Sequence, residues 1–452
     1  MNIKEIQNQN PWWSDKNYFC DEAEFVKRDL FLELKKDLSS YFITSILGLR
    51  RVGKSTLMKQ LISSLLEEKK RHHIFYYFFD QHSQIKTTSF LDELLEFYIE
   101  KILKEKIYQL KEKVYIFLDE IQYINNWEDV IKKYYDLSNK KIKFIVSGSQ
   151  SILIQNRNKE SLAGRIFEYY LPPLNFQEFL KIKKSSLVLE KLDIKKVGED
   201  FWHWNEVDFE IGHEIENLTY EYILHGQFPE CLFIDSIEKK NEYILESVLG
   251  KILEDIIRIK GIDRQEEFKA SCFHFLNNIS SIFELKNIGE IVGVSFITME
   301  KYLSHLINGY IVEKFYKKNK SIIKKGRSQK KIYATSTNFT CALNDYNQRS
   351  FLEVPDVFGK ILENLIYNVL CQKYTDLYFW RKREKEVDFI VDGLAVEVKF
   401  KNQIDRQDLR NIIFYAERNN LETVILITKN QLEEREVRGI KIYLIPFYLL
   451  LG

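Results

Sequence analysis

The feature that most constrains the fold is a segment of eight residues, Gly48-Leu-Arg-Arg-Val-Gly-Lys-Ser55, which matches G-x-x-x-x-G-K-[ST] in full. An apolar, β-rich run precedes it at 41–47, and a stretch with helical spacing follows at 56–70. In this strand–loop–helix order, backbone N–H groups of the loop and the N-terminus of the helix both face a bound anion. Further apolar runs alternate with helical stretches up to residue 146 and indicate a parallel α/β sheet covered on both faces.

The loop predicts a site for ATP and Mg²⁺. Lys54 is expected to reach the β- and γ-phosphates and to act in catalysis, and the Ser55 hydroxyl is expected to bind Mg²⁺. The residues expected to contact ATP are Gly48, Leu49, Arg50, Arg51, Val52, Gly53, Lys54, Ser55, Thr56 and, from a later strand, Ser147.

A second motif, Val114-Tyr-Ile-Phe-Leu-Asp-Glu120, ends an apolar strand in two acidic residues. Asp119 is expected to hold Mg²⁺ through water, and Glu120 to polarise the attacking water as a general base. The adjacent acidic pair favours hydrolysis over storage of the nucleotide. The alternative is an ordinary buried strand that ends in a solvated acidic turn.

Two later segments offer groups to the same site. The strand at 143–146 leads to Ser147 and Ser149, either of which could bond the γ-phosphate or the water; a serine that caps a helix is the alternative. Arg165, in Leu162-Ala-Gly-Arg165, is a candidate for stabilising transition-state charge in its own site or in a neighbour's. A structural salt bridge is the alternative for this arginine.

A helix-turn-helix pattern lies at 287–307 with its turn at Gly293, and strand-like runs at 311–315 and 331–334 flank a wing. The 18 residues from Lys314 to Lys331 hold nine Lys or Arg and no acidic residue, which is typical of a surface that contacts phosphate backbones. The expected nucleic-acid contacts are Lys301, Lys317, Lys318, Lys320, Lys324, Lys325 and Arg327. The alternative is a solvated hairpin on a helical module that packs against the ATPase.

Near the C-terminus, Asp388 and the Glu397-Val-Lys399 triplet lie on two predicted strands joined by Asp392-Gly393, a strong hairpin-turn signal. Positions i and i+2 of a strand share a face, so Glu397 and Lys399 point the same way. Glu363, on an apolar predicted helix, can join from one side. Glu363, Asp388 and Glu397 are therefore a predicted Mg²⁺ site, with Lys399 as its catalytic lysine, beside a scissile phosphate. Alternating charges on an exposed strand are the alternative.

Composition narrows the class of protein. The 67 Lys and Arg nearly balance the 66 Asp and Glu, which excludes a uniformly basic nucleic-acid binder and an acidic solvating protein. The five cysteines show no metal-ligand or redox spacing and indicate free thiols in a reducing compartment. Because no signal-peptide pattern and no apolar run of membrane length occurs, we expect a cytoplasmic protein without a membrane partner.

The chain resembles the prokaryotic AAA+-type P-loop ATPases that carry a winged helix and a C-terminal restriction-endonuclease-like domain. The matching segments are Asn10-Pro-Trp-Trp13, Gly48–Ser55, Leu118-Asp-Glu-Ile-Gln122, Ser147-Gly-Ser149, Leu162-Ala-Gly-Arg165, the run 171–179, Lys331-Ile-Tyr333, Glu363-Asn364 and the set Asp388, Glu397 and Lys399. The resemblance implies a parallel sheet of the additional-strand (ASCE) type, with a catalytic Glu beside the Walker B Asp, and a nuclease-like α/β fold of the PD-(D/E)xK type.

Two segments depart from the pattern of that family. A Gly-Gly-x-Pro stretch reads His225-Gly-Gln-Phe-Pro229 here, and Thr335-Ser-Thr337 replaces the Asp usual after the Lys-x-Tyr strand. Both concern the geometry between domains rather than nucleotide binding. The expected division is an AAA+ P-loop ATPase core at 1–182, a helical lid region at 183–270, a winged helix at 271–337 and a PD-(D/E)xK nuclease-like domain at 338–452.

The leading hypothesis is a Mg²⁺-dependent ATP-hydrolysing protein whose nucleotide state controls a DNA-facing winged helix and a nuclease-like domain. The alternative is a nucleotide-gated binding switch, in which a catalytically inactive nuclease-like domain docks a protein or nucleic-acid partner. A third reading has the wing contact protein or membrane instead of nucleic acid. A homo-oligomer is a further expected partner state, in which Arg165 would serve a neighbour's site.

Overall fold

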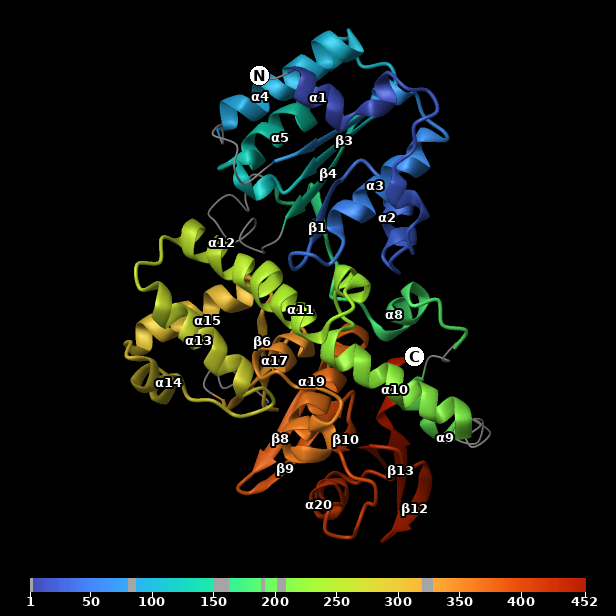
Figure 1. Cartoon of the computed structure of the whole chain (residues 1–452), viewed down its shortest axis with the longest axis vertical. Helices are drawn as coiled ribbons and strands as arrows, with labels where there is room; N and C mark the ends of the chain where they lie inside the picture. The colour runs from blue at the N-terminus through green and yellow to red at the C-terminus, as the bar shows by residue number, and fades with distance from the viewer. Residues whose placement is uncertain (1–2, 80–86, 149–161, 188–191, 201–208, 319–327) are drawn as a thin grey trace. The chain divides into compact units, whose positions relative to one another are not determined.

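The structure is a computed structural model that describes residues 3–79, 87–148, 162–187, 192–200, 209–318 and 328–452 (Figure 1). The chain forms two compact units, each with a core of its own. The first unit is Met1–Pro173 with Asn308–Tyr310, and the second is Leu174–Ile307 with Ile311–Gly452. The boundaries predicted at 182, 270 and 337 divide the chain more finely than this.

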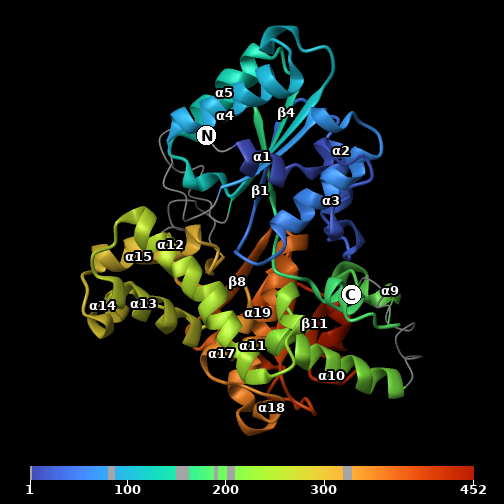
Figure 2. The ribbon, with the colours of Figure 1, turned by 45° about the horizontal axis from the view of Figure 1, so that its top comes forward.

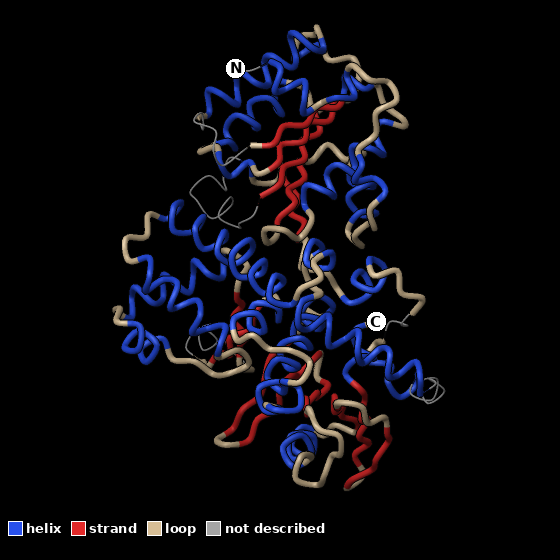
Figure 3. The backbone as a smooth tube through the Cα atoms, in the orientation of Figure 1, coloured by secondary structure: helices blue, strands red, loops and turns tan. Residues whose placement is uncertain are grey.

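A parallel sheet in the strand order β2-β3-β4-β1-β5 forms the centre of the first unit. Its strands are β1 (Ile43–Leu47), β2 (Ile74–Phe78), β3 (Val114–Asp119), β4 (Ile142–Gly148) and β5 (Ile166–Tyr170). Every residue of β1, β3 and β4 is buried, as the continuous apolar runs predicted for a sheet covered on both faces. Because β4 lies between β1 and β3, the additional-strand order is confirmed; Figure 3 shows the strands enclosed by helices.

The helices of the first unit are α1 (Ile3–Gln9), α2 (Phe31–Asp37), α3 (Lys54–Leu66), α4 (Thr88–Phe97) and α5 (Trp127–Leu137). The apolar residues of 21–40 have helical spacing in the sequence, yet the structure interrupts this stretch between a 3-10 turn, Asp21–Glu24, and α2. The side-chain amide of Gln60 donates to the carbonyl oxygens of Glu22 and Phe25, both at 3.0 Å. Gln60, which is distant in the sequence, therefore bonds two carbonyl oxygens that in a continuous helix would accept hydrogen bonds from backbone N–H groups.

Helices and a mixed six-stranded sheet form the second unit. Its sheet, in the order β12-β13-β11-β10-β9-β8, comprises β8 (Leu377–Lys382), β9 (Lys385–Val391), β10 (Leu394–Lys399), β11 (Thr423–Thr428), β12 (Glu433–Val437) and β13 (Ile440–Pro446). The helices are α8 (Phe176–Ile182), α9 (Val197–Asp200), α10 (Phe209–His225), α11 (Ile237–Glu242), α12 (Lys251–Lys260), α13 (Gln265–Asn277), α14 (Leu285–Val292), α15 (Phe296–Asn308), α17 (Thr337–Leu343), α18 (Ser350–Glu353), α19 (Pro355–Lys373) and α20 (Arg410–Asn419). None of the helices in the described ranges is long and apolar enough to cross a membrane.

The helix-turn-helix pattern and the hairpin lie where the sequence predicted them. Helix α14 ends at Gly293, which takes a φ of 80°, and α15 begins three residues later; Figure 2 shows both helices beside α13. Strands β6 (Val312–Tyr316) and β7 (Lys330–Ala334) then pair in antiparallel fashion. A bridge between Ile282 and Lys331 adds a third segment to this hairpin, on the far side of β7.

The predicted turn between β9 and β10 is also present. Asp392 and Gly393 take φ angles of 46° and 94°, and Val391 pairs with Leu394 across them. Two consecutive left-handed residues in a two-residue loop are the geometry that Asp-Gly favours, because its twist matches that of the strands. The turn sets the register of β9 against β10 and so brings their polar residues together.

Candidate functional site

The phosphate loop joins the end of β1 to the start of α3. Gly53, directly before the helix, has a φ of 97°, and a Cβ on Gly48 would lie 2.3 Å from the carbonyl oxygen of Leu171. A side chain would be strained at the first position and would clash with backbone at the second. The loop therefore has the glycine-dependent shape that a phosphate-binding turn at a helix N-terminus requires.

The ammonium of Lys54 lies inside this loop. Its Nζ donates to the carbonyl oxygens of Gly48 at 3.2 Å and Leu49 at 2.8 Å, and lies 3.7 Å from Oε1 of Glu120. Burial lowers the pKa of Lys54, while the charges of Glu120 and Asp119 act to raise it. The structure thus brings together the two groups predicted to act in hydrolysis.

Hydroxyl groups surround the fully buried carboxylate of Asp119. Its Oδ2 accepts a hydrogen bond from Tyr76 at 2.8 Å, its Oδ1 accepts one from Ser147, and the Ser55 hydroxyl acts to lower its pKa. Burial raises the pKa of Asp119, the charge of Glu120 adds to this, and the three hydroxyls oppose it. The two residues predicted to bind Mg²⁺, Ser55 and Asp119, therefore influence each other electrostatically.

Glu120 leaves the strand direction. Its φ is 56°, in the left-handed region, and its backbone N–H donates to Oγ of Ser147 at 3.0 Å. Its carboxylate accepts a hydrogen bond from the amide of Gln122. A non-glycine residue in this region costs about 1–3 kcal/mol. That strained turn directs the glutamate toward Lys54 instead of along the sheet.

Sequence reasoning assigned no role to three residues of this site: Tyr76, Gln122 and Arg28. Nothing in an apolar strand distinguishes a tyrosine that supports an acid from one that only fills the core. The buried Arg28 donates from Nη1 to the carbonyl oxygen of Val52 at 2.5 Å and from Nη2 to that of Pro172 at 2.8 Å. It fastens the loop to the segment after β5, and only the tertiary structure reveals this contact.

The other residues predicted to contact ATP differ in their surroundings. Leu49 and Val52 are buried in the loop, Arg50 contacts the hydroxyl of Tyr123, and Arg51 takes a φ of 64°. Thr56 lies in the first turn of α3, whereas Ser149 lies outside the described residues.

The structure shows an ion pair for Arg165. Its Nε lies 3.4 Å from Oδ1 of Asp136, and both side chains are partly exposed. This is the salt bridge that the sequence offered as the alternative. The role of Arg165 in hydrolysis stays a prediction.

The C-terminal strands bring Asp388, Glu397 and Lys399 together, as the hairpin predicted. Oε1 of Glu397 accepts from Nζ of Lys399 at 2.7 Å, and Oδ2 of Asp388 accepts from the backbone N–H of Val398 at 2.9 Å. Burial raises the pKa of Glu397 to about 8, the charge of Asp388 adds to this, and Lys399 opposes it.

Glu363, on α19, contacts a lysine that was not part of the predicted set. Its Oε1 accepts from Nζ of Lys331 at 2.7 Å and from the hydroxyl of Tyr333 at 2.6 Å. Within the ranges that the structure describes, no three His, Cys, Asp or Glu side chains are grouped so that they could hold a metal ion. Nζ of Lys331 lies between Glu363 and Asp388, and the Mg²⁺ site predicted from Glu363, Asp388 and Glu397 stays a prediction.

The predicted nucleic-acid contacts are only partly described. Lys301 is exposed on α15 and Lys318 is exposed beyond the end of β6, while Lys317 is partly buried. The backbone N–H of Lys318 donates to the carbonyl oxygen of Phe379 at 2.9 Å, so the hairpin continues onto β8. Four of the predicted contacts lie outside the described residues: Lys320, Lys324, Lys325 and Arg327.

Comparison with known families agrees with the first site. Residues 40–180 match a family model described as an AAA domain. Residues 216–350 and 358–449 match two models that are each described as a domain of unknown function (DUF8612 and DUF4143). The chain therefore carries a nucleotide-binding P-loop ATPase domain, built on the parallel sheet described above.

Two relatives resemble the chain over most of its length. An uncharacterized protein of Methanocaldococcus jannaschii is 23% identical over 442 residues, which are 96% of this chain and 87% of that protein. An uncharacterized protein of Haemophilus influenzae is 25% identical over 419 residues, which are 90% and 94% of the two chains.

Two solved structures have partial similarity to the chain. The Aeropyrum pernix Orc1 protein in complex with DNA is 11% identical, with 75% of this chain and 96% of that chain covered and a TM-score of 0.33. AMPPCP-bound DnaA from Aquifex aeolicus is 14% identical, with 66% and 92% covered and a TM-score of 0.30. Similarity at this level does not extend to ligand or mechanism.

Proposed function

We propose that the chain is a Mg²⁺-dependent ATPase, with Lys54, Ser55, Asp119 and Glu120 as its reacting site. The observation that carries the proposal is the pair of Lys54 and Glu120 at 3.7 Å beside the buried carboxylate of Asp119. The Ser55 hydroxyl acts to lower the pKa of that carboxylate. Hydroxyl and carboxylate oxygens are the ligands that Mg²⁺ prefers, so these residues fit the ion. Bound there, Mg²⁺ would neutralise charge on the β- and γ-phosphoryl oxygens.

Each residue of the site would have a distinct role in ATP hydrolysis. Lys54 would exchange its bonds to loop carbonyls for phosphate oxygens, and the N–H groups of the loop would bind the same phosphates. Glu120 would accept the proton of the attacking water, and the amide of Gln122 would keep its carboxylate in position. Ser147, which bonds both Asp119 and the N–H of Glu120, would fix the two acids relative to each other.

Two substitutions test this proposal. Lys54→Ala should abolish ATP binding, whereas Glu120→Gln should keep binding and lose hydrolysis. Lys59→Ala is a matched control, because Lys59 lies on the same helix and pairs with Glu22 at 2.5 Å outside the site. Undiminished turnover in both site variants would contradict the assignment.

We also propose that nucleotide state controls a surface on the β6–β7 hairpin that contacts DNA. Support comes from the run of basic residues in this segment and from the exposure of Lys318. ATP hydrolysis should be measured with double-stranded, single-stranded and no DNA at two salt concentrations, because binding to phosphates weakens as salt rises. DNA affinity that is absent or independent of salt would favour a protein or membrane partner.

The nuclease-like end of the chain has two candidate functions. The contact of Glu363 with Lys331 favours a domain that docks a partner without cutting DNA. DNA nicking that depends on Mg²⁺ or Mn²⁺, and that Lys399→Ala removes, would instead establish cleavage. Intact DNA under every nucleotide condition would favour the binding switch.

A further inference from the structure

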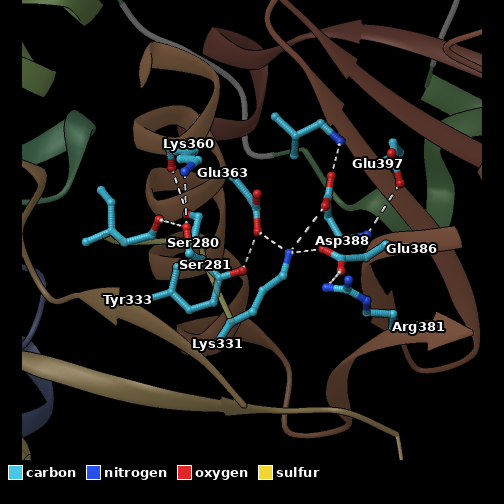
Figure 4. Close-up of polar contacts among 12 residues, drawn as sticks. Ser280, Ser281, Lys331, Tyr333, Lys360, Glu363, Arg381, Glu386, Asp388 and Glu397 are labelled. Carbon is cyan, nitrogen blue, oxygen red and sulfur yellow. Dashed lines mark hydrogen bonds and ion pairs between the residues drawn. The ribbon is translucent and has the colours of Figure 1, made fainter. Parts of the chain in front are cut away.

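A lysine from the β6–β7 hairpin stands at the centre of a group of carboxylates. Nζ of Lys331 lies 2.7 Å from Oε1 of Glu363, 2.6 Å from Oε1 of Glu386 and 3.5 Å from Oδ1 of Asp388. Figure 4 shows its amine with Glu363 on one side and Asp388 and Glu386 on the other. The lysine side chain is 2% exposed, so this ammonium has exchanged water for three acidic partners.

The backbone around Lys331 is held on both sides. Within the hairpin Lys331 pairs with Phe315, and on its other side it is bridged to Ile282. The hydroxyl of Ser280 donates to the carbonyl oxygen of Lys360 at 2.8 Å, which fastens the bridging segment to α19. Because α19 also carries the glutamate that the ammonium contacts, the same framework positions both charges.

Several carboxylate oxygens of this cluster already have internal partners. Oε1 of Glu363 accepts from Lys331 and also from the hydroxyl of Tyr333 at 2.6 Å. Glu397 is paired with Lys399 at 2.7 Å rather than with the ammonium of Lys331. Two lysines therefore supply the positive charge that a metal ion would supply to such a site.

Mg²⁺ and Mn²⁺ need several oxygen ligands around one point, at about 2.1 Å for Mg²⁺. Nζ of Lys331 occupies a position within reach of both Glu363 and Asp388. A second cation at this position would be repelled by the ammonium. We infer that Lys331 is a resident cation that keeps divalent metal ions out of this carboxylate cluster, so that the nuclease-like end folds as a metal-free module. The inference rests on the proposed nuclease-like site and is independent of ATP hydrolysis.

The test is Mn²⁺ uptake by the full chain without nucleotide, measured from the electron paramagnetic resonance signal of free Mn²⁺. Wild type and Asp388→Asn should take up Mn²⁺ equally, because the cluster holds none in either protein. Lys331→Met should gain about one Mn²⁺ per chain, and the double variant with Asp388→Asn should lose that gain. Any Mn²⁺ at the phosphate loop is common to all four proteins and cancels in the comparison.

Lys330→Met is the matched control, because it removes a positive charge from the preceding position of β7 and should leave Mn²⁺ uptake unchanged. Uptake in the wild type that Asp388→Asn abolishes would overturn the inference, whether or not Lys331→Met folds. A folded Lys331→Met protein without additional uptake would overturn it as well. ATP turnover of Lys331→Met should equal that of the wild type. A wild-type protein without ATP turnover would count against the proposed ATPase. It would not change what the Mn²⁺ measurement shows about the carboxylate cluster.

Discussion

Tyr76 donates a hydrogen bond of 2.8 Å to Oδ2 of Asp119 from the neighbouring strand of the sheet. Phe78 pairs with Asp119, and residues two apart on a strand share a face, so Tyr76 points to the same side as the acid. Burial raises the pKa of Tyr76 far above its ordinary value, and Asp119 adds to this, so the phenol remains a donor at neutral pH.

We expect Tyr76→Phe to lower ATP turnover about tenfold and to raise the Mg²⁺ concentration that gives half the maximal rate. A hydrogen bond to a charged group contributes about 1.5–3 kcal/mol, and about 1.4 kcal/mol corresponds to a factor of ten in rate. Asp119 would keep its bond to Ser147. The measurement is ATP hydrolysis as a function of Mg²⁺ concentration.

Tyr77→Phe is the control for this prediction. The hydroxyl of Tyr77 donates to Glu5 at 3.2 Å, on the opposite side of the strand from Tyr76. Its removal should leave turnover and Mg²⁺ dependence unchanged. Equal effects of the two substitutions would show that strand β2, and not the bond to Asp119, is what matters.

Arg165 and Asp136 can be separated by single substitutions. An ion pair with two partly exposed side chains contributes about 0–1 kcal/mol, so Asp136→Ala should change neither stability nor turnover noticeably. If Arg165 stabilises transition-state charge, Arg165→Ala should lower turnover by at least about tenfold while ATP still binds. Small and similar effects of both substitutions would mean that Arg165 forms only the ion pair with Asp136 and does not act in hydrolysis.

Mixing two inactive variants would decide which site Arg165 serves. Arg165→Ala chains keep Glu120, and Glu120→Gln chains keep the arginine. If the arginine acts on a neighbouring chain, mixed assemblies should regain ATP turnover. Turnover that stays at the level of the separate variants would place Arg165 in its own site.

The buried pair of Asp37 and Lys143 should contribute strongly to the stability of the first unit. Their side chains are 9% and 0% exposed and lie 2.9 Å apart. Asp37→Asn should lower the free energy of unfolding by about 3–5 kcal/mol, because it leaves a buried ammonium without its partner. Asp92→Asn is the control: Asp92 pairs with the exposed Lys133, and its loss should cost less than about 1 kcal/mol.

The same pair predicts a dependence on pH. Burial alone would raise the pKa of Asp37, but hydrogen bonds from Thr44, Lys143 and Ser40 lower it below its ordinary value. A carboxyl group with a lowered pKa stabilises the fold above its unfolded pKa of about 3.9 and loses that contribution as the pH falls through the folded pKa. Urea midpoints of the wild type should therefore decline more steeply below about pH 4 than those of Asp37→Asn.

Asn338 should be the most sensitive polar residue of the second unit. It is fully buried, its Oδ1 accepts from the backbone N–H of Gln227 at 2.8 Å, and its amide donates to the carbonyl oxygens of Tyr222 and Ile223. Asn338→Ala should lower the free energy of unfolding by at least about 2 kcal/mol, because the buried N–H of Gln227 loses its partner and two carbonyl oxygens each lose one of their two. A thermal unfolding curve that matches the wild type would contradict this. Asn344→Ala, at the exposed end of the same helix, should cost less than about 1 kcal/mol.

The two segments that depart from the family pattern turn out to contact each other. The side-chain amide of Gln227 donates to the hydroxyl of Thr337 at 3.0 Å, and the hydroxyl of Ser336 donates to Oε1 of Gln227 at 2.6 Å. Each departure therefore supplies the hydrogen-bond partner of the other. More than a hundred residues separate them in the chain, so no local pattern could connect them.

The basic run at 314–331 was predicted as one surface, and the structure divides it. Lys318 is exposed, whereas Lys331 is buried among carboxylates. The number of charged residues in a segment does not reveal which of their side chains become buried. A strand alternates its side chains between two faces, and only the packing of β7 against α19 and β9 decided where this lysine points.

Local sequence was enough to predict the phosphate loop, the strands that carry its acidic residues, the helix-turn-helix and the Asp392-Gly393 turn. Each of these depends on glycine conformation or on hydrophobic periodicity within a few residues. Two contacts depend on how distant segments pack: the bond of Tyr76 to Asp119, and the position of Lys331 between Glu363 and Asp388. Local patterns set the face on which a side chain lies, but a buried charge takes its partner from whichever distant element packs against that face.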